Sequence, residues 1–130
     1  MTPLGIDHVV LRVRDLERAV DFYQRVLGCA VERRKDALGM VQMRAGASLI
    51  DLIAIDGKLG LAGGAGPGRE GRNMDHLCLA VDKFDLVSVR AHLERHSVEV
   101  GAVGERDGAS GFSTSIYLTD PDGNGLELRG

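Results

Sequence analysis

The chain has 130 residues, of which 44% are hydrophobic and 27% are charged, and its net charge at pH 7 is −3. This size and composition are typical of one globular domain with its own core, so we expect residues 1–130 to form a single domain. Acidic and basic residues are interspersed, which argues against a nucleic-acid partner, and no basic amphipathic helix offers a membrane-binding face. No apolar run reaches the ~20 residues that span a bilayer.

The start of the chain and its cysteines indicate a compartment. The first residues lack the charged start and the long apolar stretch of a signal peptide. Cys29 and Cys78 form no CxxC pair, and nothing in the sequence sets the distance between them. We therefore expect a leaderless, cytoplasmic protein whose two thiols stay reduced.

The first half of the chain predicts one helix and four strands. Residues 6–13 alternate as a strand does, and Asp15 is a candidate N-cap for a helix that stops at Gly28. Three more strands are expected at 29–34, 39–44 and 48–55, with turns at 36–38 and at Gly46.

The second half repeats this order after a glycine-rich linker, 57–73, for which we expect a plain flexible connection. The predicted elements are a strand at 74–81, a helix at 85–96, a strand at 98–103, a loop at 104–112 and strands at 113–119 and 125–129, the last two joined by a turn at 120–124. The sequence therefore predicts an α+β fold of two βαβββ modules, 4–56 and 74–130, whose curved mixed sheet surrounds a shared cavity.

The two modules carry matched polar residues. His8 and His76 occupy the same place in the first strand of each module, and Asp51 and Glu127 lie inside the last strands, between apolar residues. A carboxylate in such a setting is costly unless it is paired or bound to a cation. A single strand histidine is more often only hydrogen-bonded, but four matched residues in two repeats favour one metal site. Imidazole and carboxylate donors suit divalent Zn, Ni, Co, Mn or Fe.

Several segments together resemble the vicinal oxygen chelate superfamily, which includes glyoxalase I, extradiol dioxygenases, fosfomycin-resistance proteins and bleomycin-binding proteins. The resemblance covers nearly the whole chain. The segments that carry it are Ile6–Val13, Asp15–Tyr23, Val26–Gly28, Met74–Leu77 and Asp120–Leu128.

The resemblance implies a metal held by His8, His76 and Glu127. Glyoxalase-like members add a glutamate from the last strand of the first module, where this chain has Asp51, one methylene shorter. Whether Asp51 binds the metal, acts through a water or serves only as a base stays open. In a glyoxalase-like reaction, Asp51 and Glu127 are the candidate general bases.

Three further side chains are candidates for orienting an anionic substrate, namely Arg12, Arg44 and Tyr117. Their place on the site face depends on the registers of their strands. His92 and His96 lie one helical turn apart, but no third ligand accompanies them, and we expect a solvated helix end there.

The resemblance implies a metal-dependent, glyoxalase-like lyase or isomerase, similar to lactoylglutathione lyase, that acts on a small oxygenated metabolite. The alternatives are an extradiol-type Fe(II) dioxygenase, a thiol transferase that acts on an antibiotic, and a metal-free module that binds a drug or another ligand. No clear glutathione-binding set is evident in the residues. We expect a homodimer, and the sequence leaves open whether modules pair within a chain or between chains.

Overall fold

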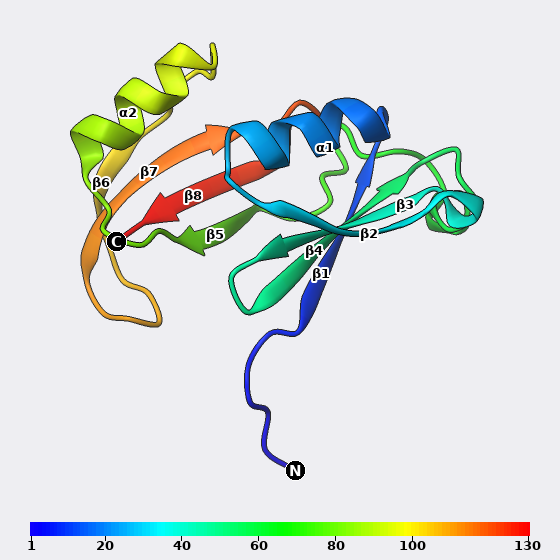
Figure 1. The fold of residues 1–130 in the computed structure, drawn as a ribbon, viewed down its shortest axis with the longest axis horizontal. Helices are drawn as coiled ribbons and strands as arrows, with labels where there is room; N and C mark the ends of the chain where they lie inside the picture. The colour runs from blue at the N-terminus through cyan, green and yellow to red at the C-terminus, as the bar shows by residue number, and fades with distance from the viewer. The chain divides into compact units, whose positions relative to one another are not determined.

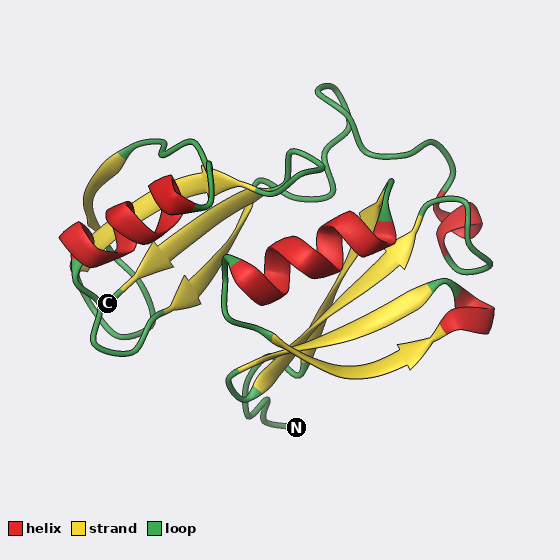
Figure 2. Ribbon diagram, turned by 45° about the horizontal axis from the view of Figure 1, so that its top comes forward, coloured by secondary structure: helices red, strands yellow, loops and turns green.

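The computed structural model describes residues 1–130 and has the predicted α+β fold, built from two βαβββ units (Figure 1). Unit 1 comprises Met1–Asn73 and unit 2 comprises Met74–Gly130. Each unit contains a four-stranded mixed sheet and one α-helix (Figure 2). No helix has the length and apolar character that crossing a bilayer requires.

The bounds of the elements follow the predicted order closely. Unit 1 contains β1 (His8–Val13), α1 (Leu16–Arg25), β2 (Ala30–Lys35), the 3-10 helix η1 (Asp36–Leu38), β3 (Met40–Ala45), β4 (Ser48–Ala54) and the 3-10 helix η2 (Gly60–Gly63). Unit 2 contains β5 (His76–Ala80), α2 (Leu86–Arg95), β6 (Val103–Arg106), β7 (Ser113–Thr119) and β8 (Gly125–Arg129).

The two sheets have the same topology. The strand orders are β1-β4-β3-β2 and β5-β8-β7-β6, so the first and last strands of each unit are neighbours. These neighbours, β1 with β4 and β5 with β8, run parallel, and the other pairs are antiparallel. This topology places each strand histidine beside the strand that carries the acid of the same unit.

Helix α1 forms where its capping and spacing predict it. The Asp15 side chain accepts a hydrogen bond of 3.0 Å from the backbone N–H of Arg18, which satisfies one free donor of the first turn. The helix buries four residues on one face, Ala19, Val20, Phe22 and Tyr23. Gly28 has a φ of 69°, a left-handed conformation that glycine adopts without strain and that ends the helical segment.

Helix α2 is capped in the same way but buries less. Asp85 accepts a hydrogen bond of 2.8 Å from the backbone N–H of Ser88. Leu93 is the only fully buried residue of α2. His92 and His96 lie side by side near its end, with ring centroids 4.4 Å apart.

The strand predicted at 98–103 lies later in the structure, and this prediction was wrong. Val98 and Val100 indicated a strand, but the backbone N–H of Val98 bonds the carbonyl of Leu93 and so belongs to the end of α2. Backbone hydrogen bonds to Tyr117 of β7 begin at Gly101 and Ala102, and the strand itself runs from Val103, which pairs with Ile116, to Arg106. The predicted loop 104–112 therefore shortens to residues 107–112.

The linker 57–73 makes hydrogen bonds to β1 of unit 1. The Arg12 guanidinium donates to the carbonyl of Gly64 at 3.2 Å and to that of Ala65 at 3.0 Å. The side-chain amide of Asn73 donates to the carbonyl of Arg12 at 3.0 Å. Sequence patterns do not reveal these contacts, because they join residues more than fifty positions apart.

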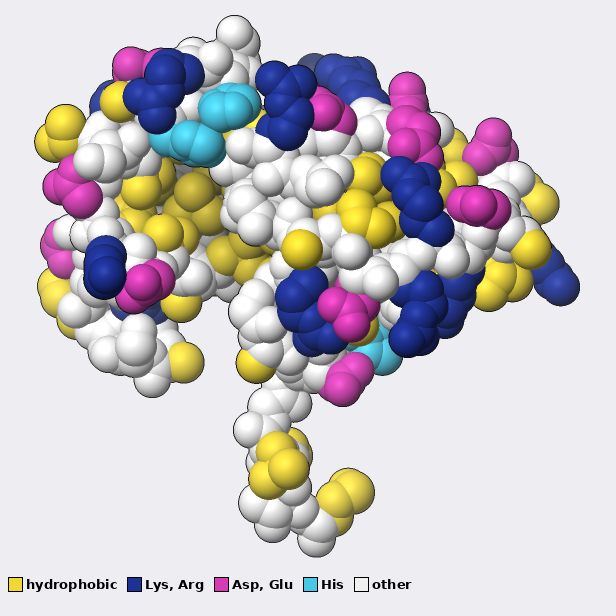
Figure 3. All heavy atoms as spheres, in the orientation of Figure 1, with side chains coloured by type: hydrophobic (Ala, Val, Ile, Leu, Met, Phe, Trp, Pro, Cys, Tyr) yellow, Lys and Arg dark blue, Asp and Glu magenta, His cyan; other side chains and the backbone are white.

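Acidic and basic side chains are interspersed over the face drawn in Figure 3. They form no single basic patch on this face, which agrees with the interspersed charges of the sequence.

Candidate functional site

The best-defined polar cluster lies on one face of the unit 2 sheet. Side chains alternate along a strand, so Glu127 and Arg129 of β8 share a face, while Leu126 and Leu128 point to the other. The register pairs Glu127 with Cys78 on one side and with Tyr117 on the other. The acid is therefore in the middle of the sheet rather than at an edge.

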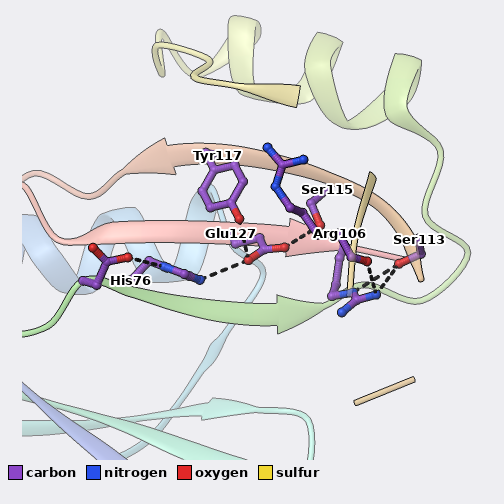
Figure 4. A network of polar contacts seen from close by, with 8 residues as sticks. His76, Arg106, Ser113, Ser115, Tyr117 and Glu127 are labelled. Atoms are coloured by element: carbon purple, nitrogen blue, oxygen red, sulfur yellow. Dashed lines mark hydrogen bonds and ion pairs between the residues drawn. The ribbon is translucent and has the colours of Figure 1, made fainter. Parts of the chain in front are cut away.

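Glu127 is 4% exposed and is held by three side chains (Figure 4). Its Oε2 lies 3.1 Å from Nε2 of His76 and accepts a hydrogen bond of 3.0 Å from the Tyr117 hydroxyl. The Ser115 hydroxyl donates to Oε1. Buried carboxylates are retained when donors surround them in this way.

These donors set the protonation of the acid. Burial by itself raises the pKa of Glu127, but hydrogen bonds from Ser115 and Tyr117, together with the charge of His76, outweigh it. The pKa of Glu127 therefore lies below its ordinary value of 4.5. The group is a carboxylate at neutral pH, as a metal ligand must be.

The neighbouring carboxylate of Asp75 orients His76. Oδ2 of Asp75 lies 2.6 Å from Nδ1 of the imidazole, which directs Nε2 toward Glu127. A carboxylate on the far nitrogen fixes the tautomer and the orientation of a metal-binding imidazole. The Tyr117 ring packs edge-on against His76, with centroids 5.5 Å apart, and limits rotation of the imidazole.

Unit 1 repeats the carboxylate–histidine arrangement. Oδ1 of Asp7 lies 2.6 Å from Nδ1 of His8. This hydrogen bond is the main cause of a raised pKa for His8, above the ordinary value of 6.5, and the charge of Asp51 raises the pKa further. Both imidazoles thus have Nδ1 bound to the preceding aspartate, which leaves Nε2 as the candidate donor to a metal.

The acid of unit 1 has a different partner from that of unit 2. Asp51 is 2% exposed, and the amide nitrogen of Gln42 lies 3.1 Å from Oδ1 and 3.2 Å from Oδ2. Gln42 pairs with Asp51 in the ladder, as Tyr117 pairs with Glu127. An amide donor therefore replaces the hydroxyl donors of unit 2, and no hydrogen bond joins His8 to Asp51.

The structure brings together three of the predicted site residues, namely His76, Glu127 and Tyr117. Neither unit alone gathers three or more histidine, cysteine or acidic side chains in an arrangement that could hold a metal ion. Convergence of His8 and Asp51 with the residues of unit 2 on one metal stays a prediction.

The other two predicted substrate residues have partners within unit 1. The Arg12 guanidinium binds linker carbonyls, and Nε of Arg44 lies 3.3 Å from Oε2 of Glu32. Arg44 also donates to the carbonyl of Ala47 at 3.3 Å. Their role toward a substrate stays a prediction.

The contacts of Asp7 and Asp75 with the histidines that follow them were not predicted from the sequence. Neighbouring residues within a strand point to opposite faces, so neither aspartate is expected to reach the following histidine. However, β1 begins at His8 and β5 at His76, and each aspartate precedes its strand. The repeated Asp-His pair at the start of both modules marked this arrangement. No comparable sequence pattern predicted that Gln42 would contact Asp51 or that Ser115 would contact Glu127.

The donor chemistry of these residues fits a divalent metal. Imidazole nitrogens and carboxylate oxygens are the ligands of zinc, nickel, cobalt, manganese and non-haem iron. Cys78 lies beside Glu127, where burial first, and then the charge of Glu127, raises the pKa of its thiol to about 11. The thiol therefore stays protonated at neutral pH in the metal-free protein, and the imidazole of His76 and the carboxylate of Glu127 remain the candidate donors of unit 2.

Comparison with known proteins identifies similar chains. The chain is 28% identical over 124 residues to a catechol-2,3-dioxygenase of Bacillus subtilis, covering 95% of this chain and 40% of that protein. It is 31% identical over 126 residues to the glyoxalase domain-containing protein RDO1 of Mycosarcoma maydis, covering 95% of this chain and 66% of that protein. This chain therefore spans less than two thirds of the length of either relative.

A solved structure shows the same fold over the whole chain. Virulence protein STM3117 from Salmonella typhimurium superimposes with a TM-score of 0.80 and 28% identity, over 99% of this chain and 98% of that one. The family profile of the Glyoxalase/Bleomycin resistance protein/Dioxygenase superfamily matches residues 5–128. As its two Asp-His strands and its last-strand glutamate predicted, the chain belongs to this superfamily.

Proposed function

We propose that the chain is a metal-dependent lyase or isomerase that acts on a small metabolite with two neighbouring oxygens. The observation that carries this proposal is the buried Glu127, whose Oε2 lies 3.1 Å from Nε2 of His76, while Asp75 holds the opposite nitrogen of the imidazole. A structural ion pair would need no such orientation of the ring. A metal ligand does, and family membership supports this interpretation.

In this proposal His8, His76 and Glu127 hold the divalent metal, which acts as a Lewis acid toward the substrate's oxygens. Asp51 is the fourth candidate ligand. Because Gln42 contacts both of its oxygens, we favour a role for Asp51 as a base over a role as a ligand.

A proton moved between adjacent carbons requires a carboxylate that can accept it and return it. Glu127 is less available than Asp51 as a proton acceptor, because hydroxyl groups and an imidazole already contact the oxygens of Glu127. Asp51 has only a neutral amide donor, which holds the carboxylate in place without neutralising it. Asp51 would therefore accept the proton from one substrate carbon and return it to the neighbouring carbon.

An Fe(II) dioxygenase is the second candidate. Two observations favour it, namely the similarity to a catechol-2,3-dioxygenase and the engagement of Asp51 by Gln42. With Asp51 outside the ligand set, His8, His76 and Glu127 form the two-histidine, one-carboxylate set of non-haem iron enzymes.

Elemental analysis of untagged protein, purified without chelators, tests both proposals. About one nickel, cobalt, zinc or manganese per chain would support the isomerase, and thiol adducts of 2-oxoaldehydes are the first substrates to assay. Iron, with oxygen uptake in the presence of catechols, would support the dioxygenase. A chain that binds no metal, even on titration, would refute both and leave a metal-free binding module.

We also propose that the chain forms a homodimer, as the sequence led us to expect. Sedimentation velocity at micromolar concentration measures this directly, and a mass of 13.9 kDa at all concentrations would contradict it.

A further inference from the structure

Two arginines on the Glu127 face of unit 2 have no acidic partner. Arg106 lies in β6 and Arg129 in β8, and neither forms an ion pair. In unit 1, by contrast, Arg34 pairs with Glu17 and Arg44 with Glu32. No acidic side chain therefore lies within ion-pair distance of either arginine.

Arg129 is the more unusual of the two, because the residue is only 4% exposed. Its Nε and Nη2 lie 3.1 and 2.6 Å from the Ser113 hydroxyl. Nη2 also donates to the carbonyls of Arg106 and Gly111. Every oxygen that Arg129 contacts is neutral.

A buried guanidinium without a counter-anion is unfavourable, even when neutral oxygens accept its hydrogen bonds. One nitrogen of the Arg129 guanidinium also has no hydrogen-bond acceptor. Nη1 makes no hydrogen bond and lies on the side of Gly108, and because no fully buried side-chain nitrogen or oxygen lacks a partner, Nη1 keeps some contact with solvent. A ligand that brings a negative charge to Nη1 would supply both the counter-anion of the guanidinium and a hydrogen-bond acceptor for this nitrogen.

The loop 107–112 is shaped to accommodate the guanidinium. Gly108 and Gly111 exchange two backbone hydrogen bonds, of 3.0 and 2.9 Å, which close the loop. A Cβ at Gly108 would overlap the guanidinium of Arg129. The absence of a side chain at Gly108 thus lets the charge lie against the loop backbone.

Arg106 brings a second positive charge to the same face. It pairs with Ser113 in the ladder, and its guanidinium lies 5.8 Å from the centroid of the Tyr117 ring (Figure 4). A Cβ at Gly104 would lie 2.7 Å from Nη1 of Arg106, so here too a glycine leaves room for a guanidinium. Arg106 therefore extends over the side chain that binds Glu127.

We propose that Arg129, assisted by Arg106, binds a carboxylate group of the substrate. This inference rests on the proposed function, because it places the substrate's neighbouring oxygens at His76 and Glu127. Glu127 and Arg129 are two residues apart on one strand face, which separates their Cα atoms by roughly 7 Å. The substrate class is then a small oxo or hydroxy acid whose carboxylate lies a few bonds from the reacting carbons. The one accessible nitrogen of Arg129 favours a carboxylate over a phosphate, which needs more donors.

The test uses the full chain, freed of metal by a chelator and titrated with succinate at constant ionic strength. Calorimetry should show saturable binding, and succinate should raise the melting temperature. Arg129→Met should weaken succinate binding at least tenfold, Arg129→Lys less, and the matched control Arg90→Met, an exposed arginine of α2, not at all. Inorganic phosphate should bind more weakly than succinate.

A purely structural role for Arg129 makes different predictions. In that case Arg129→Met would lower the melting temperature but leave succinate affinity unchanged, and this result would overturn the proposal. Absence of saturable binding to the wild-type chain, or stronger binding of phosphate than of succinate, would also overturn it. If Arg129→Met does not fold, the succinate affinities of Arg129→Lys and Arg106→Met test the proposal instead. An unchanged succinate affinity in both variants would overturn it.

The metal-loaded protein provides an independent readout. Arg129→Lys should raise KM for an acidic substrate with little change in kcat, and it should leave KM for the methyl ester of that substrate unchanged. Because the succinate titration is done without metal, failure of His76→Ala to lose metal would refute the proposed function without affecting the anion measurement.

Discussion

The amide nitrogen of Gln42 lies 3.1 and 3.2 Å from the two oxygens of Asp51, on the strand next to it. The matching position in unit 2 is Tyr117, whose hydroxyl donates to one oxygen of Glu127 at 3.0 Å. The repeat thus keeps the acid and changes its donor. Glu127 keeps an oxygen next to His76, whereas both oxygens of Asp51 are engaged by one amide.

Glu127→Gln and His76→Ala should each reduce bound metal from about one to below about 0.1 per chain, because each variant removes one donor of a proposed three-donor set. Elemental analysis after dialysis measures the metal, and circular dichroism checks the fold. His92→Ala in α2 is the control and should retain full metal. Unchanged metal content in both site variants would remove this pair from the metal site.

Asp75→Asn should weaken metal binding by about 10- to 100-fold, because the variant loses the charged partner that orients the His76 ring. Competition with a chromophoric chelator measures the affinity. Asp82→Asn, at an exposed residue of the same unit, should have no effect. Equal affinities for the two variants would show that Asp75 has no role in orienting the imidazole.

Asp51→Asn should retain metal and substrate binding but reduce kcat by at least about 100-fold, because an amide cannot accept the proton. Single-turnover kinetics on the metal-loaded protein separates binding from turnover. Loss of metal in this variant would instead identify Asp51 as a ligand, and unchanged kcat would exclude it from the mechanism.

Gln42→Leu should lower the free energy of unfolding by about 1–3 kcal/mol, because it leaves the buried Asp51 carboxylate without its donor. Urea denaturation measures the change. Gln24→Leu, at an exposed position of α1, is the matched control and should change stability little. A neutral effect of Gln42→Leu would mean that Asp51 finds another partner.

The pKa of His8 in the metal-free protein should lie above 6.5, because Asp7 stabilises the protonated ring. A raised folded-state pKa means that the His8–Asp7 interaction stabilises the fold below pH 6.5 and is lost as pH rises through the folded-state pKa. An NMR titration of the imidazole protons measures this pKa. Asp7→Asn should return it toward 6.5, while Asp56→Asn, an exposed acid of the same unit, should leave it raised.

Much of the fold was predictable because its signals are local. The N-caps Asp15 and Asp85, the left-handed Gly28 and the strand alternation each depend on residues within a few positions. The start of β6 was not predictable, because it depends on which residue first pairs with β7, a contact between distant parts of the sequence.

By itself, the sequence determined the repeat, the family and the identity of the histidines and acids, because these follow from order and spacing along the chain. Only the tertiary structure showed that Gln42 engages Asp51, that Ser115 and Tyr117 hold Glu127, and that Arg129 is buried without an acid. These contacts join residues on neighbouring strands, so they depend on the register of the sheet, which the hydrophobic pattern of a single strand does not specify.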